Sequence, residues 1–393
     1  VLLTERMVQP MDKPTVQDIF HRFYPAYLDQ YSPSPVQAKV AHNIMNCKTG
    51  AYGANVCVCE DCGFVQIHYN SCRNRCCPMC QAVPKEMWMD ARREDVIDAP
   101  YFHLVFTVPD ILNPVIYSNQ RLLYDALYHA ASSTISELTA DPKRLGAKVG
   151  YICILHTWGS EMNFHPHIHT ILLGGGLASN NQWKDNGENF FLPIRVISKM
   201  FRGKYLEELK RLWKEDKLVF HGTAEKFRNH YTFKELLDSC YGMDWIPHCK
   251  KTFNGAQTVI KYLGKYTHRI AVSNHRIVRM DDDTVTFLVK DYRNEGQWKE
   301  LTISGVEFVR RFLMHVPPRR FVRIRHYGLL CSRTKNQKLT LCRNLLGCKK
   351  YLSKLRDMEM PEILEHLYGI KVCVCKACGG HLGKPQMRMP LRC

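Results

Sequence analysis

The stretch HPHIHTILL at residues 165–173 predicts a β-strand that carries a regular set of polar side chains. Successive side chains of a strand point to opposite faces, so His165, His167 and His169 share one face. His167 and His169 are the better pair, because Pro166 lacks the N–H that a strand ladder needs. Two imidazoles on one face can bind one metal ion, and without a thiolate the set favours a labile Mg2+ or Mn2+ whose shell a phosphate completes. The alternative is the polar face of an edge strand.

The segments on both sides of this strand predict an α+β protein. β-Branched and aromatic runs predict strands, and apolar residues at helical spacing predict helices. Without a βαβ phosphate fingerprint, we expect an antiparallel sheet with packed helices rather than a Rossmann fold. The expected strands lie at 101–108, 151–158, 245–250 and around 275–303, and Gly174–Gly176 are expected to close the strand at 165–173. The expected helices lie within 14–46 (two helices) and at 84–98, 114–139, 196–216, 223–240, 254–269 and 304–315.

A pair of tyrosines lies on the helix expected at 254–269. Tyr262 and Tyr266 are four positions apart, so they share one helix face, with Lys261 and Lys265 beside them. Two tyrosines at this spacing are more often core packing than catalytic groups. A phenol with a pKa near ~10 becomes a useful nucleophile when a metal ion polarises its phosphodiester target, and the histidine strand offers that ion.

Cysteine pairs near the N-terminus predict a zinc site. Eight of the eighteen cysteines lie between Cys47 and Cys80, and two CxxC pairs are formed by Cys59, Cys62, Cys77 and Cys80. Each pair turns two thiolates toward one point, so two pairs complete a tetrahedral structural Zn2+ site. Cys47 and Cys72 could belong to the same module, and Cys57 or Cys76 could replace a neighbour. The alternative is a set of free buried thiols.

A weaker cysteine pattern lies near the other end of the chain. Cys375 and Cys378 form a further CxxC pair, with His381 and Cys393 nearby. These four residues could surround one ion only if the loop between them were strained, so the sequence does not decide whether they form a second metal site.

The charge distribution indicates a polyanionic partner. The 393 residues carry a formal charge of +18, and fourteen Lys and Arg residues lie between 310 and 356 without one Asp or Glu. Such clustering favours nucleic acid over a basic face kept for solubility. Arginine offers bidentate geometry to phosphate, so the predicted DNA contacts are Arg319, Arg320, Arg323 and Arg325; the alternative is a solvated helix or strand face.

The composition excludes several classes of protein. Hydrophobic residues make up 45% and charged residues 23%, which is typical of a globular chain and not of a disordered one. We expect no membrane partner, because no stretch approaches ~18 uncharged apolar residues. The start of the sequence lacks a secretory signal, so we expect an intracellular protein with reduced cysteines.

Taken together, these motifs resemble the HUH-type rolling-circle transposases of the insertion sequence 91 family, which carry a zinc-binding domain ahead of the nuclease. The resemblance covers about residues 35 to 350. It rests on segments in the same order: NSCRNRCCPMCQ (70–81), YFHLVFTVP (101–109), LHTWG (155–159), HPHIHTILLGGGL (165–177), YLGKYTHRIAVSNHRI (262–277) and FVRRFLMHVPPRRFVRIRHYGLL (308–330). Relatives commonly have His where this chain has Cys76.

The resemblance implies a mechanism and a role for each matching residue. In such enzymes a tyrosine attacks single-stranded DNA at the element end, leaving a 5′-phosphotyrosine and a free 3′-OH, and a second tyrosine receives the other strand. The implied partners are single-stranded or hairpin DNA at element ends and target DNA. The implied location is the cytoplasm of a prokaryote, with the protein associated with the nucleoid when it is bound to DNA. The implied residues are the metal ligands His167 and His169, the nucleophiles Tyr262 and Tyr266, and the zinc ligands Cys59, Cys62, Cys77 and Cys80. Candidates for a third ligand of the catalytic ion are His103, His156, Glu161 and His268; His156 is equally well read as a core histidine.

These inferences divide the chain into three predicted parts. They are a helical zinc-binding domain at 1–98, an HUH tyrosine endonuclease at 99–305 and a basic DNA-contacting region at 306–393. Two other functions remain. A plasmid replication initiator or relaxase would use the same chemistry, and a non-enzymatic zinc-dependent DNA-binding protein would need the histidines and tyrosines to be structural. A tyrosine recombinase is disfavoured, because it uses arginines and histidines around one tyrosine.

Overall fold

A central antiparallel sheet organises the computed structural model, which describes residues 13–186, 192–245, 248–253, 259, 264, 271–291 and 296–388. The sheet order is β11-β4-β5-β3-β7, with β6 paired to β5, and every pairing is antiparallel. The strands are β3 (Tyr101–Thr107), β4 (Lys148–Trp158), β5 (Phe164–Leu177), β6 (Trp183–Asp185), β7 (His248–Phe253) and β11 (Ile324–Gly328).

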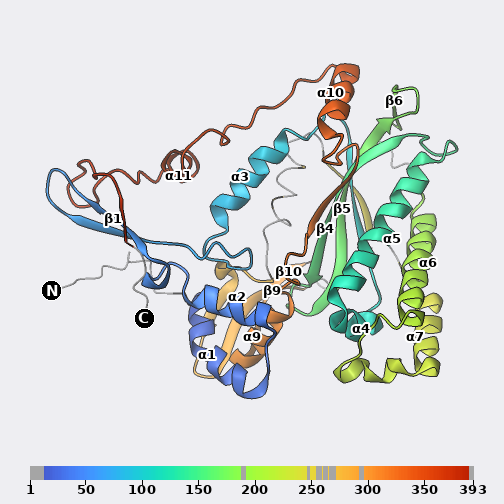
Figure 1. Ribbon diagram of the computed structural model, residues 1–393, viewed down its shortest axis with the longest axis horizontal. Helices are drawn as coiled ribbons and strands as arrows, with labels where there is room; N and C mark the ends of the chain where they lie inside the picture. The colour runs from blue at the N-terminus through green and yellow to red at the C-terminus, as the bar shows by residue number, and fades with distance from the viewer. Residues whose placement is uncertain are drawn as a thin grey trace.

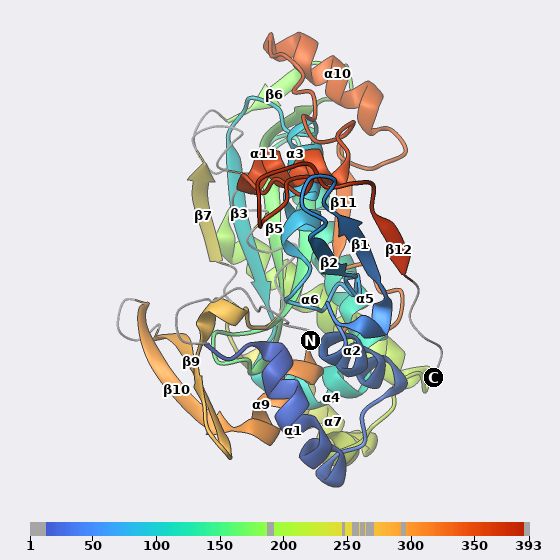
Figure 2. The same cartoon turned by 90° about the vertical axis from the view of Figure 1, so that its left-hand side faces the viewer.

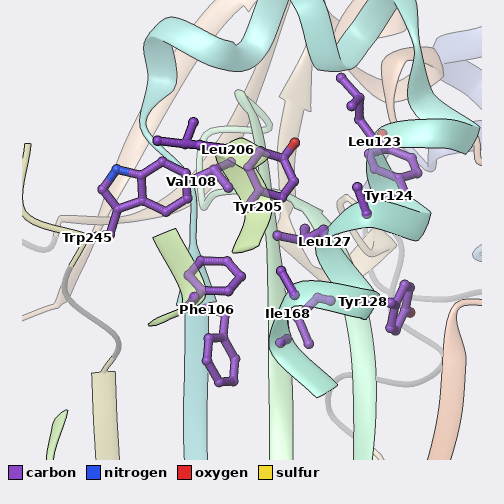
Figure 3. Close-up of a cluster of buried hydrophobic side chains, with 14 of the residues drawn as sticks. Phe106, Val108, Leu123, Tyr124, Leu127, Tyr128, Ile168, Tyr205, Leu206 and Trp245 are labelled. Atoms are coloured by element: carbon purple, nitrogen blue, oxygen red, sulfur yellow. The ribbon is translucent and has the colours of Figure 1, made fainter. Parts of the chain in front are cut away.

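One face of this sheet is covered by helices, as Figure 1 shows on the right of β4 and β5. The even-numbered residues of β3, such as Phe106, and Ile168 of β5 pack against Leu127 and Tyr205 of these helices (Figure 3). The covering elements are η2 (Asp110–Leu112), α4 (Asn113–Ser118), α5 (Gln120–Ala140), α6 (Ile194–Lys214), η3 (Gly222–Arg228) and α7 (His230–Gly242). The residues in this contact belong to the largest hydrophobic cluster among the described residues, and their close packing holds the helices against the sheet.

The opposite face of the sheet carries the histidines. Its apolar residues include Ile152, Ile154 and Ile171, which cluster with Met89 of α3 (Ala82–Arg93) and Leu339 of α10 (Lys335–Leu346). Side chains alternate along β4 and β5, so His156, His167 and His169 share the face of these isoleucines.

A second, smaller unit combines N-terminal helices with a later part of the chain. It contains α1 (Val16–Gln30), α2 (Pro35–Met45), η4 (Asn274–Arg276), β8 (Ile277–Met280), β9 (Thr284–Asp291), β10 (Gln297–Ser304) and α9 (Gly305–Met314). Thr15 and Ser34 begin the first two helices with capping boxes, and Pro35 occupies the first turn of α2. Phe20 of α1 meets Phe312 of α9 edge to face, with ring centroids 5.2 Å apart. The strands form the separate sheet β10-β9-β8.

A third unit is a narrow ribbon of three strands, which lies on the left in Figure 1. Its hairpin consists of β1 (Ala54–Val58), preceded by η1 (Gly50–Tyr52), and β2 (Val65–Tyr69). The third strand, β12 (Gln386–Arg388), follows α11 (Met360–Tyr368) and pairs with β1 (Figure 2). The ribbon therefore joins segments from both ends of the described chain.

The predicted α+β class, with an antiparallel sheet and packed helices, is confirmed. The structure corrects two boundaries. The strand at 165–173 continues through the three glycines to Leu177, because a Cβ on Gly175 would lie 2.3 Å from the Trp183 ring and so only glycine lets β6 pack there. The helix expected at 223–240 begins at His230, where Asn229 caps it, and a 3-10 turn precedes it. The helix expected at 254–269 lies mostly outside the described residues.

The three predicted parts of the chain are interleaved in space. Strand β11, from the basic C-terminal part, pairs with β4 in the central sheet. Helix α9 packs on α1 in the second unit, and β12 completes the N-terminal ribbon. In the part of the chain that the structure describes, no helix is long and apolar enough to span a membrane.

Candidate functional site

Three histidines meet on the face of the central sheet opposite α5 and α6. His156 of β4 is the register partner of His167 of β5, and Ile154 is the partner of His169. One ring nitrogen from each histidine lies within 4.8 Å of the other two. The two-residue period of the strands and their antiparallel register thus place three imidazoles around one point, as a metal ion requires.

Hydrogen bonds orient two of these rings. The Nδ1 of His167 lies 2.6 Å from the carbonyl oxygen of His165, so this nitrogen carries the proton and donates it. The lone pair of His167 is therefore on Nε2, which lies 3.1 Å from the Nε2 of His169. The Nδ1 of His169 lies 2.9 Å from the Nε2 of His103. When His169 donates from Nδ1 to His103, both Nε2 lone pairs are free to bind a cation, so these residues fit a metal site.

The environment keeps His167 and His169 neutral. Burial, followed by the nearby charge of His165, lowers the pKa of His167 to about 4. Burial, followed by His156, lowers the pKa of His169 well below its ordinary value of 6.5. Neutral imidazole is the form that binds metals, so the site is ready for an ion near pH 7.

His156 is held by neighbouring rings on β4 and β5. Its ring stacks on Trp158 with centroids 4.7 Å apart and meets His169 edge to face at 4.6 Å. The Trp158 ring in turn contacts the ring of the buried His315, with centroids 5.7 Å apart, and His315 is within hydrogen-bond distance of Thr157 Oγ1 (3.1 Å) and of the Met162 carbonyl (3.0 Å). Of the candidates for a third ligand, the geometry favours His156.

The other candidates lie elsewhere or outside the described residues. His103 contacts His169 from the side and is not part of the three-histidine group. Glu161 accepts a hydrogen bond from Asn163. His165 is more exposed and lies 3.2 Å from Asp110 Oδ1. His268 lies outside the described residues.

Tyr262 and Tyr266, the predicted nucleophiles, also lie outside the described residues. Two neighbours in the sequence are described, and both are helical and buried. Val259 is 1% exposed and belongs to the apolar cluster on the histidine face, together with Ile152 and Ile171. A Cβ on Gly264 would lie 1.9 Å from the Met89 sulfur, so the chain approaches α3 closely at this point.

The cysteines form two separate clusters instead of one. Cys47, Cys72, Cys77 and Cys80 have sulfurs within 4.8 Å of one another, and so do Cys59, Cys62, Cys375 and Cys378. The predicted set of Cys59, Cys62, Cys77 and Cys80 is therefore corrected. The cause is the β1–β2 hairpin, whose five residue pairs run from Ala54 and Tyr69 to Val58 and Val65. Five strand residues span roughly 17 Å, which puts Cys59 and Cys62 at the tip and the other pair beyond the base.

The first cluster is built into the second unit. Cys47 follows α2 and, like Cys77, is fully buried in the hydrophobic cluster that contains α1 and α9. The sulfurs of Cys72 and Cys80 lie 3.8 Å apart, and the Asn74 N–H points at the Cys72 sulfur at 3.4 Å. Cys76 is buried but is not one of the four cysteines of this group, and burial raises the pKa of its thiol. Sequence reasoning named Cys47 and Cys72 only as further members; the base of the hairpin brings their sulfurs to those of Cys77 and Cys80, so the four together could hold one ion.

The four predicted DNA-contacting arginines have different surroundings. Arg319 and Arg320 are exposed. Arg325 pairs with Asp125 and lies over the Tyr128 ring, 4.0 Å from its centroid. Burial lowers the pKa of Arg323, with Cys76 as a neighbour. Only the first two are therefore well placed for phosphate.

Comparisons with known proteins identify the family. Residues 19–108 match the family described as "Transposase zinc-binding domain", and residues 150–338 match the one described as "Putative transposase". The chain is 39% identical over 369 residues to "Putative transposase y4qJ" of Sinorhizobium fredii (strain NBRC 101917 / NGR234), covering 93% of each chain. It is 30% identical over 309 residues to the transposase for insertion sequence element IS801 of Pseudomonas savastanoi pv. phaseolicola, covering 77% of this chain and 72% of the relative.

Solved structures give a more distant match. The conjugative relaxase TrwC in complex with oriT DNA, in a metal-free structure, is 15% identical, with a TM-score of 0.23 over 44% of this chain and 68% of the relaxase. A similarity at this level carries no argument about the site. The sequence relatives and the two family matches confirm the predicted resemblance: the chain belongs to the insertion sequence 91 family of transposases and carries the zinc-binding domain of that family at its N-terminal end.

Proposed function

We propose that this transposase nicks and rejoins single-stranded DNA at the ends of its element through 5′-phosphotyrosine intermediates. The observation that carries the proposal is the convergence of His156, His167 and His169 on one point of the sheet. A divalent ion held there would polarise a phosphodiester and stabilise the charge that develops during attack. Imidazole ligands suit Mn2+ better than Mg2+, which prefers oxygen, so Mn2+ is the better match of the two.

Tyr262 and Tyr266 are the proposed nucleophiles. The phenol oxygen of one attacks phosphorus, the bond from phosphorus to the 3′-oxygen breaks, and that oxygen takes up a proton as the phenol loses one. The new bond retains the energy of the broken phosphodiester, so a 3′-OH can reverse the step and join another strand. Support comes from Val259, which packs on the same face of the sheet as the histidines.

Exposed arginines of the basic segment would hold the flanking DNA. Arg319 and Arg320 lie between α9 and β11, and β11 pairs directly with the strand of His156. Phosphates bound there would be at the edge of the catalytic sheet. Such contacts release counterions, so affinity should fall as salt rises.

The test is the formation of a covalent adduct on labelled single-stranded oligonucleotides that span the element ends, with Mn2+ or Mg2+. We expect an adduct on a denaturing gel that the Tyr262→Phe, Tyr266→Phe double variant loses, with the single variants ordering the two nucleophiles. Tyr231→Phe is the matched control, because Tyr231 is 75% exposed on α7, on the far side of the sheet. An adduct that survives the double variant would refute the assignment.

Two other functions give different outcomes in this assay. A replication initiator or relaxase would form the same adduct but on a different DNA site; the family relationship favours element ends. A non-enzymatic zinc-dependent DNA-binding protein would bind the oligonucleotides without metal-dependent cleavage by any variant.

A further inference from the structure

The turn at the tip of the β1–β2 hairpin and a turn near the C-terminus have the same local structure. In the first turn, the Cys59 N–H donates to the Phe64 carbonyl at 2.9 Å and the Gly63 N–H to the Cys59 carbonyl at 3.1 Å. In the second, the Cys375 N–H donates to the Gly380 carbonyl at 2.8 Å and the Gly379 N–H to the Cys375 carbonyl at 2.9 Å.

Both turns place a glycine directly after the second cysteine. Gly63 and Gly379 have φ angles of 70° and 78°, in the left-handed region that favours glycine. The sequences Cys59-Glu60-Asp61-Cys62-Gly63 and Cys375-Lys376-Ala377-Cys378-Gly379 are therefore two copies of one knuckle. Each copy directs two sulfurs to the same side.

The two knuckles face each other with the spacing of a metal shell. The Cys59 and Cys378 sulfurs lie 3.5 Å apart, and those of Cys62 and Cys375 lie 3.8 Å apart. Sulfurs at ~2.3 Å from a tetrahedral zinc ion are about 3.8 Å from one another. A disulfide would need ~2.05 Å, so the cluster has the geometry of four ligands and not of two bridges.

Backbone donors support thiolates in the C-terminal knuckle. The Ala377 N–H points at the Cys375 sulfur and the Gly380 N–H at the Cys378 sulfur, both at 3.4 Å. Such bonds stabilise negative charge on sulfur, which a zinc ligand must carry. His381 is turned away, with its Nδ1 3.4 Å from Glu60 Oε2 and its side chain 67% exposed.

The ribbon around this cluster has too little apolar core to hold itself together. Its hydrophobic cluster contains only Cys57, Cys59, Cys375 and Leu382 among the described residues. Val65 and Ile67 of β2 are about half exposed, at 52% and 47%. Yet the two segments are paired closely, with the Glu60 N–H donating to His381 and the Gly383 N–H donating to Val58. Small units of this kind are usually held by metals or disulfides.

We propose that Cys59, Cys62, Cys375 and Cys378 bind a second structural Zn2+ that fastens the C-terminal segment to the N-terminal hairpin. This site is separate from the Cys47, Cys72, Cys77 and Cys80 cluster, and half of its ligands lie beyond residue 108, where the match to the zinc-binding domain ends. Four thiolates leave no open position, so the ion organises the ribbon and does no chemistry. The proposal does not depend on the nuclease mechanism.

The first test is the metal content of the purified full chain. After dialysis has removed labile metal from the three-histidine site, we expect about two zinc ions per wild-type chain and about one in the Cys375→Ser, Cys378→Ser double variant, because each cysteine cluster closes one four-ligand shell. The matched control is Cys373→Ser, since Cys373 is exposed in the same segment but lies outside the cluster. It should retain both ions. One zinc in the wild type, or two in the double variant, would overturn the proposal.

A second test keeps the result interpretable if the double variant folds poorly. Hydrogen exchange of the wild-type chain is followed with and without a zinc chelator. Loss of the ion should raise exchange at Glu60 and Gly383 together, since these amides bridge the two segments, while β5 stays protected. If the amides of Glu60 and Gly383 remain protected after all zinc has been removed, zinc does not hold the two segments together.

Discussion

The Nε2 atom of His103 lies 2.9 Å from the Nδ1 atom of His169, and the two rings stack with an interplanar angle of 14°. His103 is on β3 and His169 on β5, which are adjacent antiparallel strands. His103 thus fixes the orientation of a proposed metal ligand without joining the ligand group. Residues with this role commonly determine metal affinity.

Replacing His103 with Ala should weaken metal binding by about 10–100-fold, the range typical for the loss of such a partner. The Mn2+ concentration for half-maximal cleavage should rise, and saturating Mn2+ should restore most of the rate. The His103→Gln variant retains an acceptor for His169, so its metal affinity is expected to lie between those of the wild type and of His103→Ala. An unchanged metal requirement in His103→Ala would show that His169 needs no such support.

Replacing His156 with Ala should abolish cleavage while leaving DNA binding largely intact, because the ion would lose one of three ligands. His165→Ala is the control on the same sheet, since the His165 carbonyl that orients His167 belongs to the backbone and is kept, and the His165 side chain contacts Asp110 and lies outside the three-histidine group. Cleavage rates and gel-shift affinities measured side by side separate the two roles. Equal losses in both variants would argue against a third ligand at His156.

Replacing Cys77 with Ser should release the zinc ion of the first cluster and destabilise the unit formed by α1, α2 and α9. Cys76→Ala is the control, because Cys76 is the adjacent residue, is equally buried and lies outside the cluster. Zinc analysis and thermal unfolding of both variants give the answer. If Cys76→Ala also loses zinc, the ligand set drawn from the geometry is wrong.

Acid should destabilise the fold through His315. Burial lowers its pKa to about 4, below the ordinary value of 6.5. Between these values the unfolded chain binds more protons than the folded one, so stability is retained above pH 6.5 and lost as the pH falls toward 4. The loss is about 3 kcal/mol at pH 4, at ~1.36 kcal/mol per pKa unit.

The measurement is urea unfolding at pH 7 and pH 4 of the wild type and of His315→Gln. Glutamine can donate to the Met162 carbonyl and accept from Thr157 but does not titrate. The other buried histidines titrate in both proteins, so the variant should lose less stability than the wild type over this interval. Identical losses would exclude His315 as a source of the acid sensitivity.

Replacing both Arg319 and Arg320 with Ala should weaken DNA binding and its salt dependence. Two lost phosphate contacts should reduce the slope of log K against log salt by about 1.4 for single strands. The Arg195→Ala, Lys199→Ala double variant controls for net charge, since it also removes two exposed positive charges, both from α6, on the other side of the sheet. Fluorescence anisotropy at several salt concentrations measures the slope. An unchanged slope would place the DNA path elsewhere.

The sequence predicted the features that depend on local pattern. The period of HPHIHTILL was enough to put His167 and His169 on one strand face, and the structure has them on β5. The role of His156 could not be settled in this way, because it depends on the register between β4 and β5. That register is fixed by the apolar residues of two strands and by the turn between them, not by either motif alone.

The cysteine partners were beyond local reasoning for a different reason. A CxxC pair reveals that two sulfurs point to one place, but not which pair supplies the others. Cys59 and Cys62 lie closer in sequence to Cys77 than to Cys375, yet the rigid hairpin holds them away from Cys77. The pairing of β1 with β12 decides which cysteine pair joins Cys59 and Cys62, and the spacing of cysteines along the sequence does not predict that pairing.

The position of β12 also has a consequence for the order in which the molecule is completed. During synthesis, β1 and β2 leave the ribosome one after the other and can form their hairpin at once, but the strand on the other side of β1 emerges after every other described element. A polypeptide that stops after α10 would still contain the three histidines of the sheet, whereas Cys59 and Cys62 would have half of their shell. The ribbon thus becomes complete only after β12 has been translated.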